Sequence, residues 1–117
     1  MRHRKQGKTL GRKSAPRKAL MRNLVTSLVI FEHVDTTIVK AKLLRSDAEK
    51  LITVGKENTL TSRRRLLEEL YTKKAVDKVL EVLGPRYKDQ KGGYTRITRL
   101  GQRKGDGAEM ARIEFIS

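Results

Sequence analysis

The stretch TTIVKAKLLRSDAEKLITVG, residues 36–55, predicts a long amphipathic helix. Four apolar residues recur in it at i, i+3, i+7 and i+10, so they lie on one helix face: Ala41, Leu44, Ala48 and Leu51. Thr36 or Thr37 is expected to cap the start of this helix, because a side-chain oxygen there can accept a free backbone N–H. Gly55 is expected to end it.

Two elements are expected before this helix. Leucine, methionine and valine recur at helical spacing from about Ser14 to about Phe31. Ser14 is the expected N-cap of that helix, and Pro16 falls in its first turn, where proline is well tolerated. A short strand is expected over residues 32–35.

Two further helices are expected after Gly55. The first starts at Asn58 or Thr59, and its predicted buried stripe is Leu66, Leu67, Leu70 and Tyr71. The second is capped by Thr72, and its apolar residues follow the helical period: Val76, Val79, Leu80 and Leu83. Gly84-Pro85 is expected to stop it, with Gly84 in the left-handed conformation and Pro85 unable to continue the helix.

The last third of the chain changes character. Residues 94–100 are β-prone, residues 101–107 read as a glycine-rich basic loop, and Ala111, Ile113 and Phe115 alternate with charged residues. These runs predict a hairpin. The element order is therefore α-β-α-α-α-β-β, an α+β fold with a single globular domain over residues 14–117.

Composition limits the class of protein. Hydrophobic residues make up 37% of the 117 residues, enough for one modest core. Lys and Arg total 28 against 13 Asp and Glu, a net charge of +15 that favours a polyanionic partner over a merely soluble surface. The absence of cysteine excludes disulfides and thiolate zinc sites. No apolar run is long enough to span a membrane, and we expect a cytoplasmic, unprocessed protein without a membrane partner.

Residues 1–13 are predicted to form a basic, flexible arm. They are rich in Lys and Arg, contain almost nothing apolar, and precede the first acidic residue, Glu32. Such a segment cannot offset its ordering entropy by burial, so we expect it to order only on a phosphate-rich surface. A purely solubilising tail is the alternative.

Basic side chains form four clusters, in the arm and the following helix, at the start of a later helix, around residue 87 and in the hairpin. Arginine forks onto phosphate oxygens, and helix N-termini favour phosphate. The predicted RNA-binding residues are Arg2, His3, Arg4, Lys5, Lys8, Arg12, Lys13, Arg17, Lys18, Arg22, Arg63, Arg64, Arg65, Arg86, Tyr87, Lys88, Tyr94, Arg96, Arg99, Arg103 and Lys104.

Two features in these clusters have equally simple structural explanations. Tyr87 and Tyr94 can stack on unpaired bases or pack at the edge of the core. The glycines of residues 92–93 and of the hairpin loop can let the backbone approach a phosphate or simply form turns.

Catalysis is not indicated. The two histidines, His3 and His33, are far apart in the chain. The sequence contains no metal-binding motif, no nucleophile-elbow motif and no P-loop motif. We therefore expect neither an enzyme nor a metal or other cofactor. An RNA-dependent enzyme would need a titratable or metal-binding cluster that these residues do not supply.

The scatter of the charge over an arm, a helix end and a loop favours an irregular folded RNA over a DNA groove. A DNA-binding protein of the nucleoid type remains the alternative, since it needs only the basic charge.

The chain also resembles a known family, the L17 family of bacterial large-subunit ribosomal proteins. The resemblance spans nearly the whole chain. The motifs that carry it are MRHRK (1–5), RKALMRNL (17–24), TT (36–37), KAK (40–42), EKLIT (49–53), PRYKD (85–89), GGYTRI (92–97), GD (105–106) and AEM (108–110).

The resemblance implies helices layered on a small sheet. It also implies a structural constituent of the ribosome that binds 23S ribosomal RNA in the large (50S) subunit, toward the side of the tunnel exit. Neighbouring large-subunit ribosomal proteins are the other implied partners, and the protein is expected to be a monomer within the particle.

Overall fold

The fold comes from a computed structural model that describes residues 14–116, so the predicted arm lies outside the described residues. The element order confirms the predicted α+β fold. The elements are α1 (Ser14–Phe31), β1 (His33–Thr37), α2 (Ile38–Gly55), α3 (Leu60–Glu69), α4 (Lys73–Lys78), the π-helical turn η1 (Val79–Leu83), α5 (Gly84–Arg86), β2 (Thr95–Gln102) and β3 (Glu109–Phe115).

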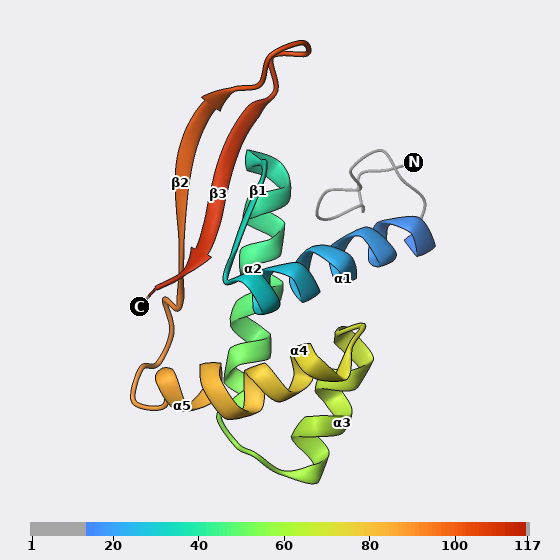
Figure 1. The fold of residues 1–117 in the computed structure, drawn as a ribbon, viewed down its shortest axis with the longest axis vertical. Helices are drawn as coiled ribbons and strands as arrows, with labels where there is room; N and C mark the ends of the chain where they lie inside the picture. The colour runs from blue at the N-terminus through green and yellow to red at the C-terminus, as the bar shows by residue number, and fades with distance from the viewer. Residues whose placement is uncertain (1–13, 117) are drawn as a thin grey trace, which may run out of the picture.

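The three strands form one antiparallel sheet in the order β1-β3-β2. His33 and Thr95 lie opposite Glu114 and Phe115 of β3, and the register of β2 shifts between Arg99 and Gly101. The predicted hairpin is confirmed, although β2 continues two residues into the expected loop. Figure 1 shows that the tip of this hairpin extends well beyond the helices.

Helix α2 joins the sheet to the other helices. It contacts all three strands as well as α1, α3, η1 and α5. Its predicted apolar face is confirmed as buried, together with alternate residues of β3. Because alternate strand residues point to one face, β3 covers the helices with Ala111, Ile113 and Phe115.

Two predicted N-caps are confirmed. Ser62 N–H donates to Thr59 Oγ1 at 3.1 Å, and Ala75 N–H donates to Thr72 Oγ1 at 3.2 Å. Thr37 precedes α2 as expected but makes no side-chain cap hydrogen bond. Ser14 is the first helical residue of α1 and not the residue before it.

The bounds of the first strand, which spans His33–Thr37 and not residues 32–35, and one apolar stripe differ from the prediction. The first strand begins at His33, because Glu32 still belongs to the end of the helix. The Glu32 N–H donates a helical hydrogen bond to Leu28 O at 2.7 Å. At α3 and the two residues that follow it, only Leu66 and Leu70 of the predicted stripe are buried, while Leu67 and Tyr71 are 45% and 44% exposed. The ten-residue helix turns a narrow face to the core, so side chains one position away point outward.

The prediction that Gly84-Pro85 stops a helix is wrong. Gly84 has φ −56°, in the right-handed helical region, and the helical path continues to Arg86. The Gly84 N–H donates to Val79 O, five residues back, which marks a π turn. This wider turn accommodates Pro85, which brings no N–H to the helical ladder.

Gly84 is needed for packing. A Cβ on Gly84 would overlap the backbone carbonyl of Gly55, and a Cβ on Gly55 would overlap the Val79 side chain. The end of α2 and the η1–α5 segment therefore meet at backbone contact, which only two glycines allow.

We expect Gly84→Ala to destabilise the fold strongly. The added methyl meets backbone atoms that cannot rotate away, so the loss should be about 2–3 kcal/mol in the free energy of unfolding. Urea unfolding followed by circular dichroism measures it. Asn23→Ala, at an exposed position of α1, is the control and should change stability by less than about 0.5 kcal/mol. Equal stability of both variants would contradict the close contact.

Glu32 ties the end of α1 to the η1–α5 segment. It has φ 65°, a conformation that is uncommon for residues other than glycine. Its carboxylate accepts from both Arg86 and Lys78, and Lys78 also donates to Ile30 O at 2.8 Å. The hydrogen bond from Arg86 is the main cause that lowers the pKa of Glu32 to about 2. Partial burial raises this pKa, and Lys78 lowers it further.

We expect Glu32→Gln to lose stability at neutral pH. The pKa of Glu32 is lower in the folded than in the unfolded chain, so its contribution is present above about pH 4.5 and disappears as pH falls toward 2. Because the carboxylate is about one-third exposed, water screens the pair, and the loss at pH 7 should be about 1 kcal/mol.

Urea unfolding of both proteins from pH 7 to pH 2 measures this difference, which should shrink toward zero at the acidic end. Glu114→Gln, which breaks a more exposed ion pair with Arg96, is the control. A difference that stays constant over the whole pH range would contradict an ionic role for Glu32.

Candidate nucleic-acid interface

The predicted hairpin arginines all lie on the projecting β2–β3 unit, and each is paired with a carboxylate. Arg96 bonds Glu114 at 3.0 Å across the strands. Arg99 bonds Glu109 at 2.7 Å, and Arg103 bonds Asp106 within the turn. The Arg103 hydrogen bond, together with the N–H of Ala108, lowers the pKa of Asp106 to about 2. Lys104 is exposed beside them.

Three other predicted arginines hold the helices together. Arg22 donates to Leu67 O and Leu70 O at 3.1 and 3.2 Å, the last carbonyls of α3, and its guanidinium lies 4.3 Å from the Tyr71 ring centre. A cation at this helix end is favourable because free carbonyls point toward it. Arg63 bonds Asp77 at 2.8 Å, and Arg86 bonds Glu32.

The two tyrosines belong to the core. Tyr87 and Tyr94 are 3% and 1% exposed, with ring centres 5.2 Å apart. Their hydroxyls donate to Ile116 O and Gln90 O. Because neither ring is open to a base, the structure supports the packing explanation and removes both from the candidate interface.

The backbone around Gly93 already holds an anion. The N–H groups of Gly93, Tyr94 and Thr95 point at the Glu49 carboxylate at 3.1–3.3 Å, and the Thr95 hydroxyl adds a fourth hydrogen bond at 3.0 Å. Successive N–H groups arranged in this way form an anion-binding nest. Here the anion is a side chain of α2, so Gly92 and Gly93 form the turn that holds Glu49.

The exposed cations that form no ion pair within residues 14–116 lie over several elements. They are Lys18, Lys42, Lys50, Arg64, Arg65, Lys73, Lys74, Lys88, Lys91 and Lys104. Five of these, Lys42, Lys50, Lys73, Lys74 and Lys91, are absent from the predicted set. Lys73-Lys74 forms a doublet that the sequence could have revealed, whereas an isolated lysine on a helix gives no such signal.

A groove of about 760 Å³ lies where α1, α2 and α3 meet. Five cations line it, Arg17, Lys18 and Arg22 from α1, Lys50 from α2 and Arg65 from α3. The groove thus gathers residues from two of the predicted clusters, which the sequence places more than 40 residues apart.

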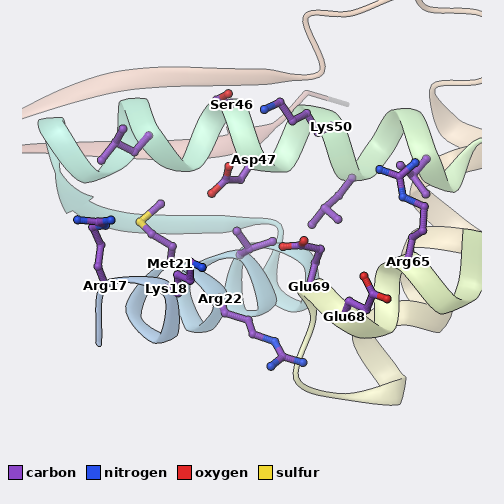
Figure 2. Close-up of a pocket in the computed structure, with 14 residues that line it drawn as sticks. Arg17, Lys18, Met21, Arg22, Ser46, Asp47, Lys50, Arg65, Glu68 and Glu69 are labelled. Atoms are coloured by element: carbon purple, nitrogen blue, oxygen red, sulfur yellow. The ribbon is translucent and has the colours of Figure 1, made fainter. Parts of the chain in front are cut away.

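Carboxylates line the same groove. Figure 2 shows Asp47 directed from α2 toward α1, and Glu69 directed from α3 into the same space, with Glu68 beside it. Partial burial raises the pKa of Asp47; nearby Lys50 opposes this and nearby Glu69 adds to it. None of the three carboxylates forms an ion pair with a described residue.

Residues 14–116 contain no group of three or more side chains suited to hold a metal ion. In the same part of the chain, no helix is both long and apolar enough to cross a membrane. The predicted arm residues, from Arg2 to Lys13, lie outside the described part.

A small α+β domain with a +15 charge, dispersed exposed lysines and arginines and a projecting basic hairpin defines a basic structural protein of the kind found in ribonucleoprotein particles. Residues 20–116 match the family model described as ribosomal protein L17. The chain belongs to this family, and it is a structural ribosomal protein and not an enzyme.

Relatives from three organisms are similar over almost the whole chain, and each is named large ribosomal subunit protein bL17. The protein of Thermomicrobium roseum is 48% identical over all of both chains. That of Dehalococcoides mccartyi is 49% identical over 99% of each. That of Acidobacterium capsulatum is 51% identical over 99% of this chain and 72% of its own length.

Proposed function

We propose that the protein binds 23S ribosomal RNA as a structural constituent of the large (50S) ribosomal subunit and supports the assembly of that subunit in the cytoplasm. The family and its large-subunit relatives support this proposal. In the particle the protein is a monomer beside other large-subunit proteins.

The observation that carries RNA binding is the distribution of unpaired positive charge. Within residues 14–116, ten exposed lysines and arginines without carboxylate partners are spread over α1, α2, α3, α4, the 87–94 segment and the hairpin tip. A duplex groove accepts one helix or one ribbon, whereas a folded RNA can surround a small protein. Scattered cations therefore fit folded RNA better than a DNA groove.

Sedimentation of a tagged copy through a sucrose gradient at moderate salt tests the proposal. We expect the protein to migrate with the large subunit in near one-to-one amount, and to leave that position when the lysate is treated with ribonuclease. Migration at the top of the untreated gradient, or with chromosomal DNA, would contradict the proposal.

The basic residues 1–13 supply part of this binding. They carry six Lys and Arg, and each phosphate that a cation neutralises contributes about 0.7–0.9 to the slope of log K against log salt. Among residues 14–116, the hydrophobic core cluster and the residues packed against it lie between residues 21 and 115.

We expect deletion of residues 2–13 to reduce the salt slope for 23S RNA fragments by roughly 4–5, the sum over six cations. The melting temperature should stay nearly unchanged. Filter binding from 50 to 300 mM salt measures the slope. A variant whose arm arginines are all replaced by lysine keeps the charge and should keep the slope. An unchanged slope after deletion would exclude the arm from the interface.

A further inference from the structure

The groove between α1, α2 and α3 contains an unusual set of side chains for so basic a protein. Six carboxylates in residues 14–116 form no ion pair with a described residue, and three of them, Asp47, Glu68 and Glu69, line this one groove. Each of the seven carboxylates that do form ion pairs within residues 14–116 holds an arginine. Here they face cations without pairing, which leaves hydrogen-bond acceptors available to a ligand.

We propose that this groove binds one unpaired guanine base extruded from the RNA. The inference rests on the proposed RNA-binding function and deepens it, because it names the part of the protein that distinguishes one base from another.

Part of the groove's lining is apolar. Met21 and Val25 of α1 and Leu51 and Val54 of α2 contribute to it, and Val25 and Leu51 are part of the buried core. Flat aromatic bases pack on such surfaces when they leave the helical stack, and the methionine thioether adapts to a ring. A volume of about 760 Å³ lies within the usual range of pockets that hold small ligands.

The rim provides contacts for the phosphates on either side of an extruded base. Arg17 and Lys18 lie on the α1 side, Lys50 on α2 and Arg65 on α3 (Figure 2). The guanidinium groups of Arg17 and Arg65 can each form two parallel hydrogen bonds to phosphate oxygens.

The carboxylates select the base. A carboxylate accepts hydrogen bonds and donates none when ionised, so it fits an edge that presents adjacent N–H groups. Among the four RNA bases only guanine presents two adjacent donors, N1–H and the 2-amino group, on its Watson–Crick edge. Asp47 and Glu69 reach the same space from opposite walls, close enough that Glu69 raises the pKa of Asp47.

The same carboxylates disfavour other occupants. They repel the phosphates of a duplex, and they leave the acceptor edge of cytosine or adenine only partly matched. Guanine is the base whose two adjacent donors match these carboxylate acceptors.

RNA hairpins with one bulged nucleotide test the inference. Fluorescence anisotropy at fixed salt compares guanosine with inosine, which lacks only the 2-amino group, and with adenosine, cytidine and uridine. We expect the wild-type protein to prefer guanosine over inosine by roughly tenfold, because losing one partner of a bidentate contact leaves an acceptor unmatched.

Two variants, Asp47→Asn and Glu69→Gln, should each lose most of this preference while still binding all the RNAs. Asp47 and Glu69 are exposed helix residues outside the core, so thermal melts should show folded proteins. Glu81→Gln removes an exposed carboxylate outside the groove and should keep the full preference.

Equal affinity of the wild type for all bulged RNAs would overturn the inference. A uniform gain of affinity for every RNA in Asp47→Asn would also overturn it. That result would mean that the Asp47 carboxylate only repels phosphate, and that the groove suits a cationic peptide. Salt-dependent binding of every hairpin would still support the proposed function in both cases. Failure to bind any of the RNAs or 23S fragments would overturn both.

Discussion

The backbone contact between Gly55 and Gly84 is the constraint on which the other contacts depend. It sets α2 directly against the η1–α5 segment, whose helical path continues through the π turn and Pro85 to Arg86. With α2 held there, one of its faces covers the sheet and another meets α1 and α3. Glu49 on α2 can then organise the turn that starts β2, so the hairpin projects in one direction from a fixed base.

Arginine and lysine differ in how often they form ion pairs in this molecule. In the part of the chain that the structure describes, six arginines form forked or close ion pairs with carboxylates from other elements or the same turn, namely Arg63, Arg86, Arg96, Arg99, Arg103 and Arg112. Most exposed cations without an ion pair among residues 14–116 are lysines. Exposed ion pairs contribute little stability, because water competes for both partners. The hairpin arginines can therefore exchange a carboxylate for a phosphate at small cost in free energy, and their pairing mainly orients them along the strands.

The sequence predicted the element order, the buried face of α2, the alternation in β3 and the caps at Thr59 and Thr72, because these depend on local periodicity and local hydrogen bonds. It failed at Gly84-Pro85, where glycine is needed for a helix contact 29 residues away along the chain. For the site, it found the basic clusters, but it could not show that Arg22 completes α3 or that both tyrosines are buried. Those facts depend on tertiary partners. The arm residues are untested by the structure.

Dispersed phosphate contacts and the groove solve different physical problems. Phosphate contacts provide affinity and fix orientation, but they carry no sequence information, so they cannot by themselves distinguish one place on a long RNA from another. A protein with a charge of +15 is attracted to every polyanionic surface. Asp47 and Glu69, which form no ion pair within residues 14–116, weaken this attraction locally, since their carboxylates disfavour an RNA segment that brings no N–H donors. Selectivity in so basic a protein therefore arises most effectively where negative charge is retained.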